Sequence, residues 1–194
     1  YCKCNHLFFL SSSFCYLEDY LNNPIVQGYI KSNHFGVLLD MDFEIIGPGE
    51  VAYSMTISKK HLATPVAAHG GSISALMDGT MGVAALSKVF LDGKVVSTLE
   101  MKISFVSPAF LDDVLTGSAN ILKSGKRILF AEGKIVNQKN QLVAVATATL
   151  TSRRFQTRSS REGEVHGGMA IGSWLATGLM FASYMQLVAG AQLR

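Results

Sequence analysis

A single carboxylate stands in an otherwise uncharged stretch of the sequence. Between Gly70 and Ser87 the one ionisable side chain is Asp78, and the other residues are apolar or small and polar. A helix that is apolar on every side is a buried helix, and no cation lies three or four positions away to pair with Asp78. Because burying an unpaired carboxylate is costly, Asp78 is a candidate for chemistry. The alternative is a thin solvent-facing stripe that Asp78 shares with Ser74 and Thr80.

The predicted helix is preceded by His69-Gly70-Gly71. The first N–H groups of a helix have no intrahelical partner and carry a partial positive charge, and glycine lets a ligand approach the backbone closely. Such donors stabilise the oxyanion that forms when a carbonyl is attacked, and a positioned carboxylate can act as the general base. On the simpler interpretation, the two glycines form only a turn.

Alternating apolar and polar residues on both sides of this helix predict β-strands. Residues 41–45 and 51–57 precede the helix and are separated by the turn Gly47-Pro48-Gly49. After Leu91-Asp92-Gly93 ends the helix, strands are predicted at 98–105, 115–121, 129–135 and 142–151. Strands joined by short turns pair antiparallel. The order therefore predicts an α+β domain in which one curved antiparallel sheet wraps around a long central apolar helix.

The predicted domain is preceded by a short tail. Residues 1–15 are interpreted as an N-terminal tail, and residues 16–153 as the domain itself. The domain begins with cover helices, which break at Asn23-Pro24 and resume as a short helix from Ile25 to Lys31. The tail holds four residues of types that bind zinc, but their spacing matches no zinc pattern, so no metal site is predicted. These residues are Cys2, Cys4, His6 and Cys15.

Residues 154–194 are interpreted as a polar linker followed by an apolar helix of unknown role. Residues 168–193 are long enough to span a bilayer, and small residues at positions 168, 172 and 176 have the spacing of membrane helix pairs. We favour a helix packed on protein over a membrane span, because membrane helices are usually richer in Leu, Ile and Val.

Composition narrows the class of protein. The chain has 194 residues, of which 48% are hydrophobic and 16% charged, which indicates one globular domain with a sizeable core. The net charge of +3 and the lack of a basic run with interleaved aromatics argue against a nucleic-acid partner. The three cysteines all lie in the first 15 residues, so no disulfide framework is expected. A cysteine-free body fits a reducing compartment, and the expected location is cytoplasmic.

The combination of these features resembles a known family. His69-Gly70-Gly71 stands nine positions before Asp78 (78 − 69 = 9), within an order of two strands, one apolar helix and four strands. This arrangement resembles the hotdog fold, and more narrowly the PaaI-like acyl-CoA thioesterases, from about Asp40 to Thr151. The best matching segments are 67–78 and 96–109. The resemblance implies hydrolysis of acyl-CoA to a free acid and CoA, without a cofactor.

The resemblance also implies catalytic roles for particular positions. Asp78 matches the carboxylate that activates water or attacks the thioester, and Gly70 and Gly71 match the glycines whose N–H groups polarise the thioester oxygen. His69 matches the histidine that shapes this turn. Ser97 matches a serine that holds the attacking water. The strand pattern agrees, because Ser97 has the same parity as the apolar row 99, 101, 103 and 105 and is predicted to face the helix.

Several positions are expected to contact the substrate. The family's asparagine, six positions before the histidine, is replaced here by Ala63, and His61 or Thr64 is the candidate substitute. Basic residues at a predicted turn are candidates for the CoA phosphates, although exposed basic turns are common. The predicted substrate-binding residues are Thr64, Phe105, Pro108, Lys126 and Arg127.

Spacing along the helix predicts an oligomer. Nine residues of helix rise about 13 Å, which is too far for Asp78 and the Gly70 N–H of one chain to flank one carbonyl. The resemblance implies a homodimer or homotetramer in which Asp78 faces the glycines of a neighbouring chain. The alternative function is a non-catalytic acyl-CoA sensor on the same fold, which would have no need of the carboxylate. A hotdog dehydratase would need a catalytic histidine, whereas His69 is placed at the turn.

Overall fold

The computed structural model describes residues 19, 20 and 22–155. The predictions made for residues 1–15 and 156–194 lie outside this part of the chain. Two short helices come first, α2 (Pro24–Ser32) and α3 (His34–Leu38), and the long helix is α4 (Gly70–Val89). The strands are β1 (Met41–Gly47), β2 (Glu50–Thr56), β3 (Lys94–Phe105), β4 (Val114–Ser124), β5 (Ile128–Val136) and β6 (Leu142–Arg154). Two 3₁₀ turns, η1 (Lys59–His61) and η2 (Phe90–Asp92), flank α4.

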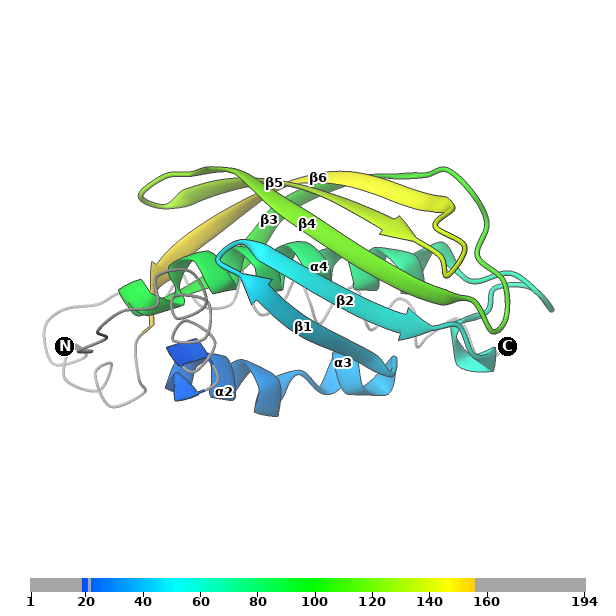
Figure 1. The fold of residues 1–194 in the computed structure, drawn as a ribbon, viewed down its shortest axis with the longest axis horizontal. Coiled ribbons are helices and arrows are strands. Elements are labelled where there is room, and N and C mark those ends of the chain that lie inside the picture. The colour runs from blue at the N-terminus through cyan, green and yellow to red at the C-terminus, as the bar shows by residue number, and fades with distance from the viewer. Residues whose placement is uncertain (1–18, 21, 156–194) are drawn as a thin grey trace, which may run out of the picture. The chain divides into compact units, whose positions relative to one another are not determined.

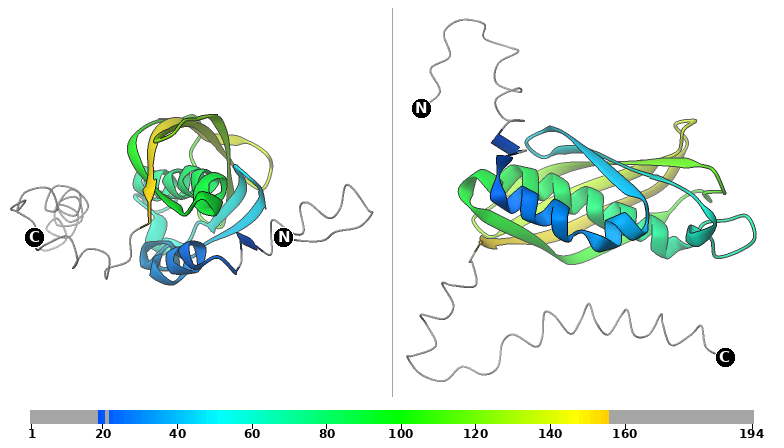
Figure 2. Two further views of the ribbon diagram at one scale, coloured as in Figure 1. Left: turned by 90° about the vertical axis from the view of Figure 1, so that its left-hand side faces the viewer. Right: turned by 90° about the horizontal axis from the view of Figure 1, so that it is seen from below.

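The predicted α+β hotdog architecture is confirmed. All six strands form one antiparallel sheet in the order β1-β2-β4-β5-β6-β3. The sheet curves around α4, and α2 and α3 lie along the side of α4 that the sheet leaves open (Figures 1 and 2). Because both the sheet and the cover helices surround α4, nearly all of its side chains can be apolar without meeting water.

Packing between α4 and the sheet forms the core. The inward positions of β4 and β5 are small or apolar, as their alternation predicts, and Leu115, Leu129 and Ile135 are fully buried. They belong to the same core cluster as Leu76 and Met81 of α4, which are also fully buried. Burial of each such side chain contributes about 1.5–3 kcal/mol, so this contact surface holds α4 in the sheet.

One strand does not pair with its neighbour in the chain. The prediction that strands joined by short turns pair in sequence is right for β1–β2, β4–β5 and β5–β6. It is wrong for β3, which pairs with β6 and not with β4. The segment 106–113 between β3 and β4 carries Pro108 and is no tight hairpin, so it can cross from one edge of the sheet to the strand beside β2. As a result, β3 is an edge strand.

The N-terminal cover helices differ slightly from the prediction. Helix α2 begins at Pro24, whose position in the first turn suits proline, and the Asn23 side chain caps it by accepting from the Ile25 N–H at 2.9 Å. Helix α3 was not predicted, because its five residues are too few to show a periodic pattern. Asn33 caps it through the Gly36 N–H at 3.0 Å.

In the described part of the chain, one helical stretch is long and apolar enough to cross a membrane. It is Gly70–Asp92, the core helix, and 67% of its most apolar window is buried inside the domain. The membrane alternative for residues 168–193 lies outside the described residues.

Candidate active site

The N-terminus of α4 is held in place by His69. The residue is the N-cap, and its Nδ1 accepts a hydrogen bond from the Gly71 N–H at 2.8 Å. His69 therefore shapes the turn as predicted, but it also occupies one of the two glycine N–H groups proposed as donors. The Gly70 N–H, at the first helical position, has no acceptor within the helix. Of the pair, Gly70 is the better placed to donate to a substrate oxygen.

A cleft of about 400 Å³ lies beside this helix start. The Phe105 ring lies across Gly70, with its Cζ atom 3.2 Å from the position that a Gly70 Cβ would occupy. The absence of a side chain at Gly70 therefore makes room for the ring. Three predicted residues, Gly70, Phe105 and Pro108, come together in this cleft. Its lining is Ala68, Gly70, Ile73, Phe105, Val106, Ser107, Pro108 and Ala109.

Asp78 lies on a face of α4 that is not fully buried. This face comprises Gly71, Ser74, Ala75, Asp78 and Gly82, which are spaced three to four apart, and Asp78 is its only charged member. Elsewhere on the helix, Lys88 in the last turn is exposed, and Gly70, Ser72 and Gly79 are partly buried. The alternative that placed Asp78 on an open stripe is therefore right for Ser74 and wrong for Thr80, which is fully buried. Asp78 is itself only half-buried, so its carboxylate can meet a ligand.

Thr98 of β3 is the hydrogen-bond partner of Asp78. Its Oγ1 donates to Asp78 Oδ1 at 2.7 Å, a short charge-assisted bond that fixes the carboxylate. The Thr98 oxygen keeps its lone pairs, so it can accept a hydrogen bond from a water beside the carboxylate. The sequence analysis missed Thr98, although it adjoins the serine that was chosen.

The predicted orientation of Ser97 is wrong. Ser97 is exposed, and since successive strand residues point to opposite faces, it points away from α4 when Thr98 points toward it. The cause is a β-bulge: Thr98 pairs with Leu150 and Glu100 with Thr149, so Leu99 is an extra residue. A bulge reverses the parity of the strand. Met101 and Ile103 therefore face inward together with Thr98, while Leu99 is 59% exposed.

His61 and Thr64 were the candidates to replace the family's asparagine, whose position is Ala63 here. In the structure, the side-chain groups of both bond to the protein's own backbone. His61 is fully buried, with Nδ1 accepting from the Ser58 N–H at 2.9 Å and Nε2 facing the Leu39 carbonyl at 3.1 Å. It fastens the loop before α4. Thr64 is exposed, but its Oγ1 accepts from the Ala67 N–H at 2.9 Å and so serves the turn of the loop.

Because His61 is buried, we expect the free energy of unfolding to depend on pH. Desolvation, followed by the nearby Lys60 charge, lowers the pKa of His61. Between that pKa and the unfolded value of about 6.5, the unfolded chain binds more protons. The contribution of the neutral His61 to the free energy of unfolding should therefore be complete above about pH 6.5. It should be lost as the pH drops toward the folded-state pKa. Urea unfolding at pH 7.5 and 5.5 measures this, and His61→Gln should weaken the dependence, whereas the exposed His34→Gln should keep it. Equal pH dependence in all three proteins would contradict the assignment.

Lys126 and Arg127 are exposed at the turn between β4 and β5. This turn lies at the end of the domain where α4 finishes, whereas α4 begins at the other end (Figure 1), and the cleft is at that beginning. Within one chain they do not join the predicted site, because the 20 residues of α4 separate the two ends by about 30 Å. Any contact with a ligand at Gly70 would have to come from another chain.

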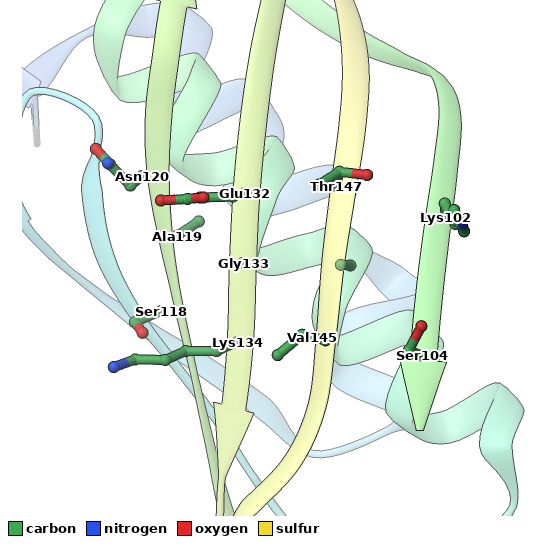
Figure 3. A pocket seen from close by; sticks show the side chains of 11 residues that line it. Lys102, Ser104, Ser118, Ala119, Asn120, Glu132, Gly133, Lys134, Val145 and Thr147 are labelled. Atoms are coloured by element: carbon green, nitrogen blue, oxygen red, sulfur yellow. The ribbon is translucent and has the colours of Figure 1, made fainter. Parts of the chain in front are cut away.

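A larger hollow, about 650 Å³, lies elsewhere on the domain. It lies over β3–β6 and is lined by exposed polar side chains, among them Lys102, Glu132 and Lys134 (Figure 3). None of the predicted site residues lines this hollow. The larger hollow is therefore not the place where the candidate catalytic residues lie. In the described part of the chain, no group of three or more His, Cys, Asp or Glu side chains is arranged to hold a metal ion.

Known proteins are similar to this chain in sequence. The Thioesterase superfamily matches residues 67–144, which run from the loop before α4 into β6. Human acyl-coenzyme A thioesterase 13 is 26% identical over 115 residues, covering 59% of this chain and 81% of the human protein. Acyl-coenzyme A thioesterase PaaI of Escherichia coli is 28% identical over 107 residues, covering 55% of this chain and 74% of PaaI.

Solved structures show the same fold. The Escherichia coli PaaI structure has a TM-score of 0.62 and 24% identity, covering 72% of this chain and 95% of PaaI. A Streptococcus pneumoniae protein described as a hypothetical thioesterase was solved with coenzyme A. It has a TM-score of 0.59 and 25% identity, covering 66% of this chain and 99% of that protein. The chain is therefore similar in sequence and in fold to proteins named thioesterases.

Proposed function

This chain carries a PaaI-like thioesterase-superfamily domain of the hotdog fold, and we propose that it hydrolyses acyl-CoA thioesters to a free acid and CoA. The observation that carries the proposal is the Asp78–Thr98 pair, a carboxylate held by a hydroxyl on the open stripe of the core helix. The relatives named acyl-coenzyme A thioesterase and the coenzyme A-bound structure neighbour support CoA esters as the substrate class.

The proposed active site is built by two chains. Gly70 and Asp78 are eight positions apart on α4 (78 − 70 = 8), which is about 12 Å of helix. Strand β3 is an unpaired edge of the sheet, and exposed apolar side chains, Leu99 and Phe105 among them, lie along it. Long exposed edges of this kind are usually covered. A two-fold pairing through β3 would reverse one α4 relative to the other and bring Asp78 toward the Gly70 of the partner.

The reaction then follows from the groups present. Asp78 takes a proton from a water that Thr98 helps to hold, and the water oxygen attacks the thioester carbonyl. The Gly70 N–H donates to the oxygen as it becomes negative, which is worth about 10²–10³ in rate for one such donor. When the carbonyl re-forms, the C–S bond breaks and the thiolate takes up the proton as CoA–SH. Direct attack by the Asp78 carboxylate, giving an anhydride that water cleaves, is the alternative course.

The compartment is part of the same proposal. The sequence from residue 16 onward holds no cysteine, which fits a reducing environment. We therefore propose a cytoplasmic location for the activity.

The test is thiol release from a panel of short, long and aromatic acyl-CoAs by three proteins. Thr98→Ala should lower turnover by about 10-fold, because water and carboxylate lose a shared partner, while Ser97→Ala should keep wild-type turnover because its side chain faces away from Asp78. The two variants remove one hydroxyl each from adjacent positions, so they are a matched pair. Acyl-CoA binding without thiol release by the wild type would favour the sensor instead. A larger loss for Ser97→Ala would contradict the site.

A further inference from the structure

Two residues of α4 close to Asp78, Met77 and Thr80, pack against glycines of the sheet. Thr80 Oγ1 occupies the place where a Cβ of Gly117 would be, and Thr80 Cβ and Cγ2 are 3.2 Å from that place. Met77 Sδ is 2.8 Å from the corresponding position at Gly133. Thr80 and Met77 are fully buried, so neither can move into solvent to make room for a side chain.

Thr80 is the more rigid of these contacts. A β-branched side chain in a helix has few rotamers, and the Thr80 hydroxyl donates to the Leu76 carbonyl at 2.6 Å. Next to it, the Tyr53 ring lies 3.3 Å from the position of a Gly79 Cβ, and Tyr53 pairs with Gly117 across β2 and β4. Two consecutive residues of α4 are therefore fixed against one row of the sheet.

The partner of Asp78 comes from a distant part of that sheet. Thr98 is on β3, and the strand order places β5 and β6 between β3 and the strand of Gly117. Two residues of helix correspond to a rotation of about 200°, so Asp78 and Thr80 point to nearly opposite sides of α4. A shift of α4 away from β4 must therefore change the position of the Asp78 carboxylate relative to Thr98.

From this geometry we propose that Gly117 is a positioning residue for Asp78. Its missing side chain lets Thr80 seat against β4, which sets the rotation and the height of α4 at which Asp78 meets Thr98. The inference rests on the proposed function, because it assigns Gly117 a part in placing the general base. It does not extend to Gly133, whose neighbours Met77 and Met81 are flexible and can give way to a methyl group.

The experiment measures kcat and KM of Gly117→Ala on the best acyl-CoA of the panel. A displacement of about 1 Å can cost up to 10²-fold in rate, so kcat should fall by about 10- to 100-fold while KM stays within about 3-fold. Thr80→Ala in the Gly117→Ala protein removes Oγ1, the nearest Thr80 atom, together with Cγ2, and should restore kcat to that of Thr80→Ala alone. Gly28→Ala, at a helical position with nothing within 4 Å, is the control and should leave kcat unchanged.

A double-mutant cycle separates positioning from general loss of packing. In the Asp78→Asn background, Gly117→Ala should cause no further loss, because the group that it places is already absent. Multiplicative losses, or unchanged kcat in folded Gly117→Ala, would overturn the inference. If Asp78→Asn itself keeps full turnover, the proposed function fails instead. Should Gly117→Ala not fold, Thr80→Ala alone, which leaves α4 unseated, must lower kcat at constant KM, and unchanged kcat would overturn the inference.

Discussion

Asp78→Asn is expected to lower turnover of acyl-CoA by about 100-fold or more. The substitution keeps the size of the side chain, and the amide oxygen can still accept the hydrogen bond that Thr98 donates at 2.7 Å. It removes the charge that takes the proton from water, and loss of a positioned general base costs about 10²–10⁴ in rate. The loss should appear in kcat, with acyl-CoA binding retained. Steady-state thiol release and equilibrium binding to the same acyl-CoA measure the two quantities.

A second carboxylate supplies the control. Asp42 is on β1 and is not among the residues of the proposed site; its carboxylate accepts the N–H of the next residue, Phe43, at 2.8 Å. Asp42→Asn removes one negative charge from the same domain and should leave turnover as in the wild type. Unchanged turnover in Asp78→Asn would move the chemistry to another residue.

Mixing two inactive variants is expected to restore activity. Gly70→Val places a branched side chain against Phe105 and fills the cleft, so it should be as inactive as Asp78→Asn. In a heterodimer of the two, one site receives an intact Gly70 from one chain and an intact Asp78 from the other. With random exchange, half of the dimers are mixed and each has one complete site. Activity should therefore recover to about a quarter of the wild type, from about 1% for either variant alone.

The outcome depends on whether the site is shared. If one chain held the whole site, no mixture of the two variants would contain a complete one, and activity would stay at the level of the separate proteins. Light scattering on each protein before mixing is the necessary companion measurement, because an active monomer would also contradict a site built by two chains. Denaturing and refolding the variants together ensures that subunits exchange.

The sequence by itself determined the layers of this domain. The alternation in residues 115–121 and 129–135 correctly gave the inward faces of β4 and β5, because side chains in a strand point alternately to the two faces. The uninterrupted apolar pattern of α4 correctly predicted a buried helix. All of these are local regularities, which neighbouring residues fix through backbone geometry alone.

Only the tertiary structure decided which side chains meet. Ser97 and Thr98 both carry a hydroxyl group, so residue type alone does not distinguish them. The bulge at Leu99 makes Thr98 the partner of Asp78. That bulge forms because β3 pairs with β6, a strand about 50 residues away in the chain. His61 is likewise polar in sequence but buried in the structure, where distant backbone groups satisfy it. Contacts between residues that are far apart in the chain leave no periodic trace in sequence, so the register of β3 and the roles that depend on it could be read only from the fold.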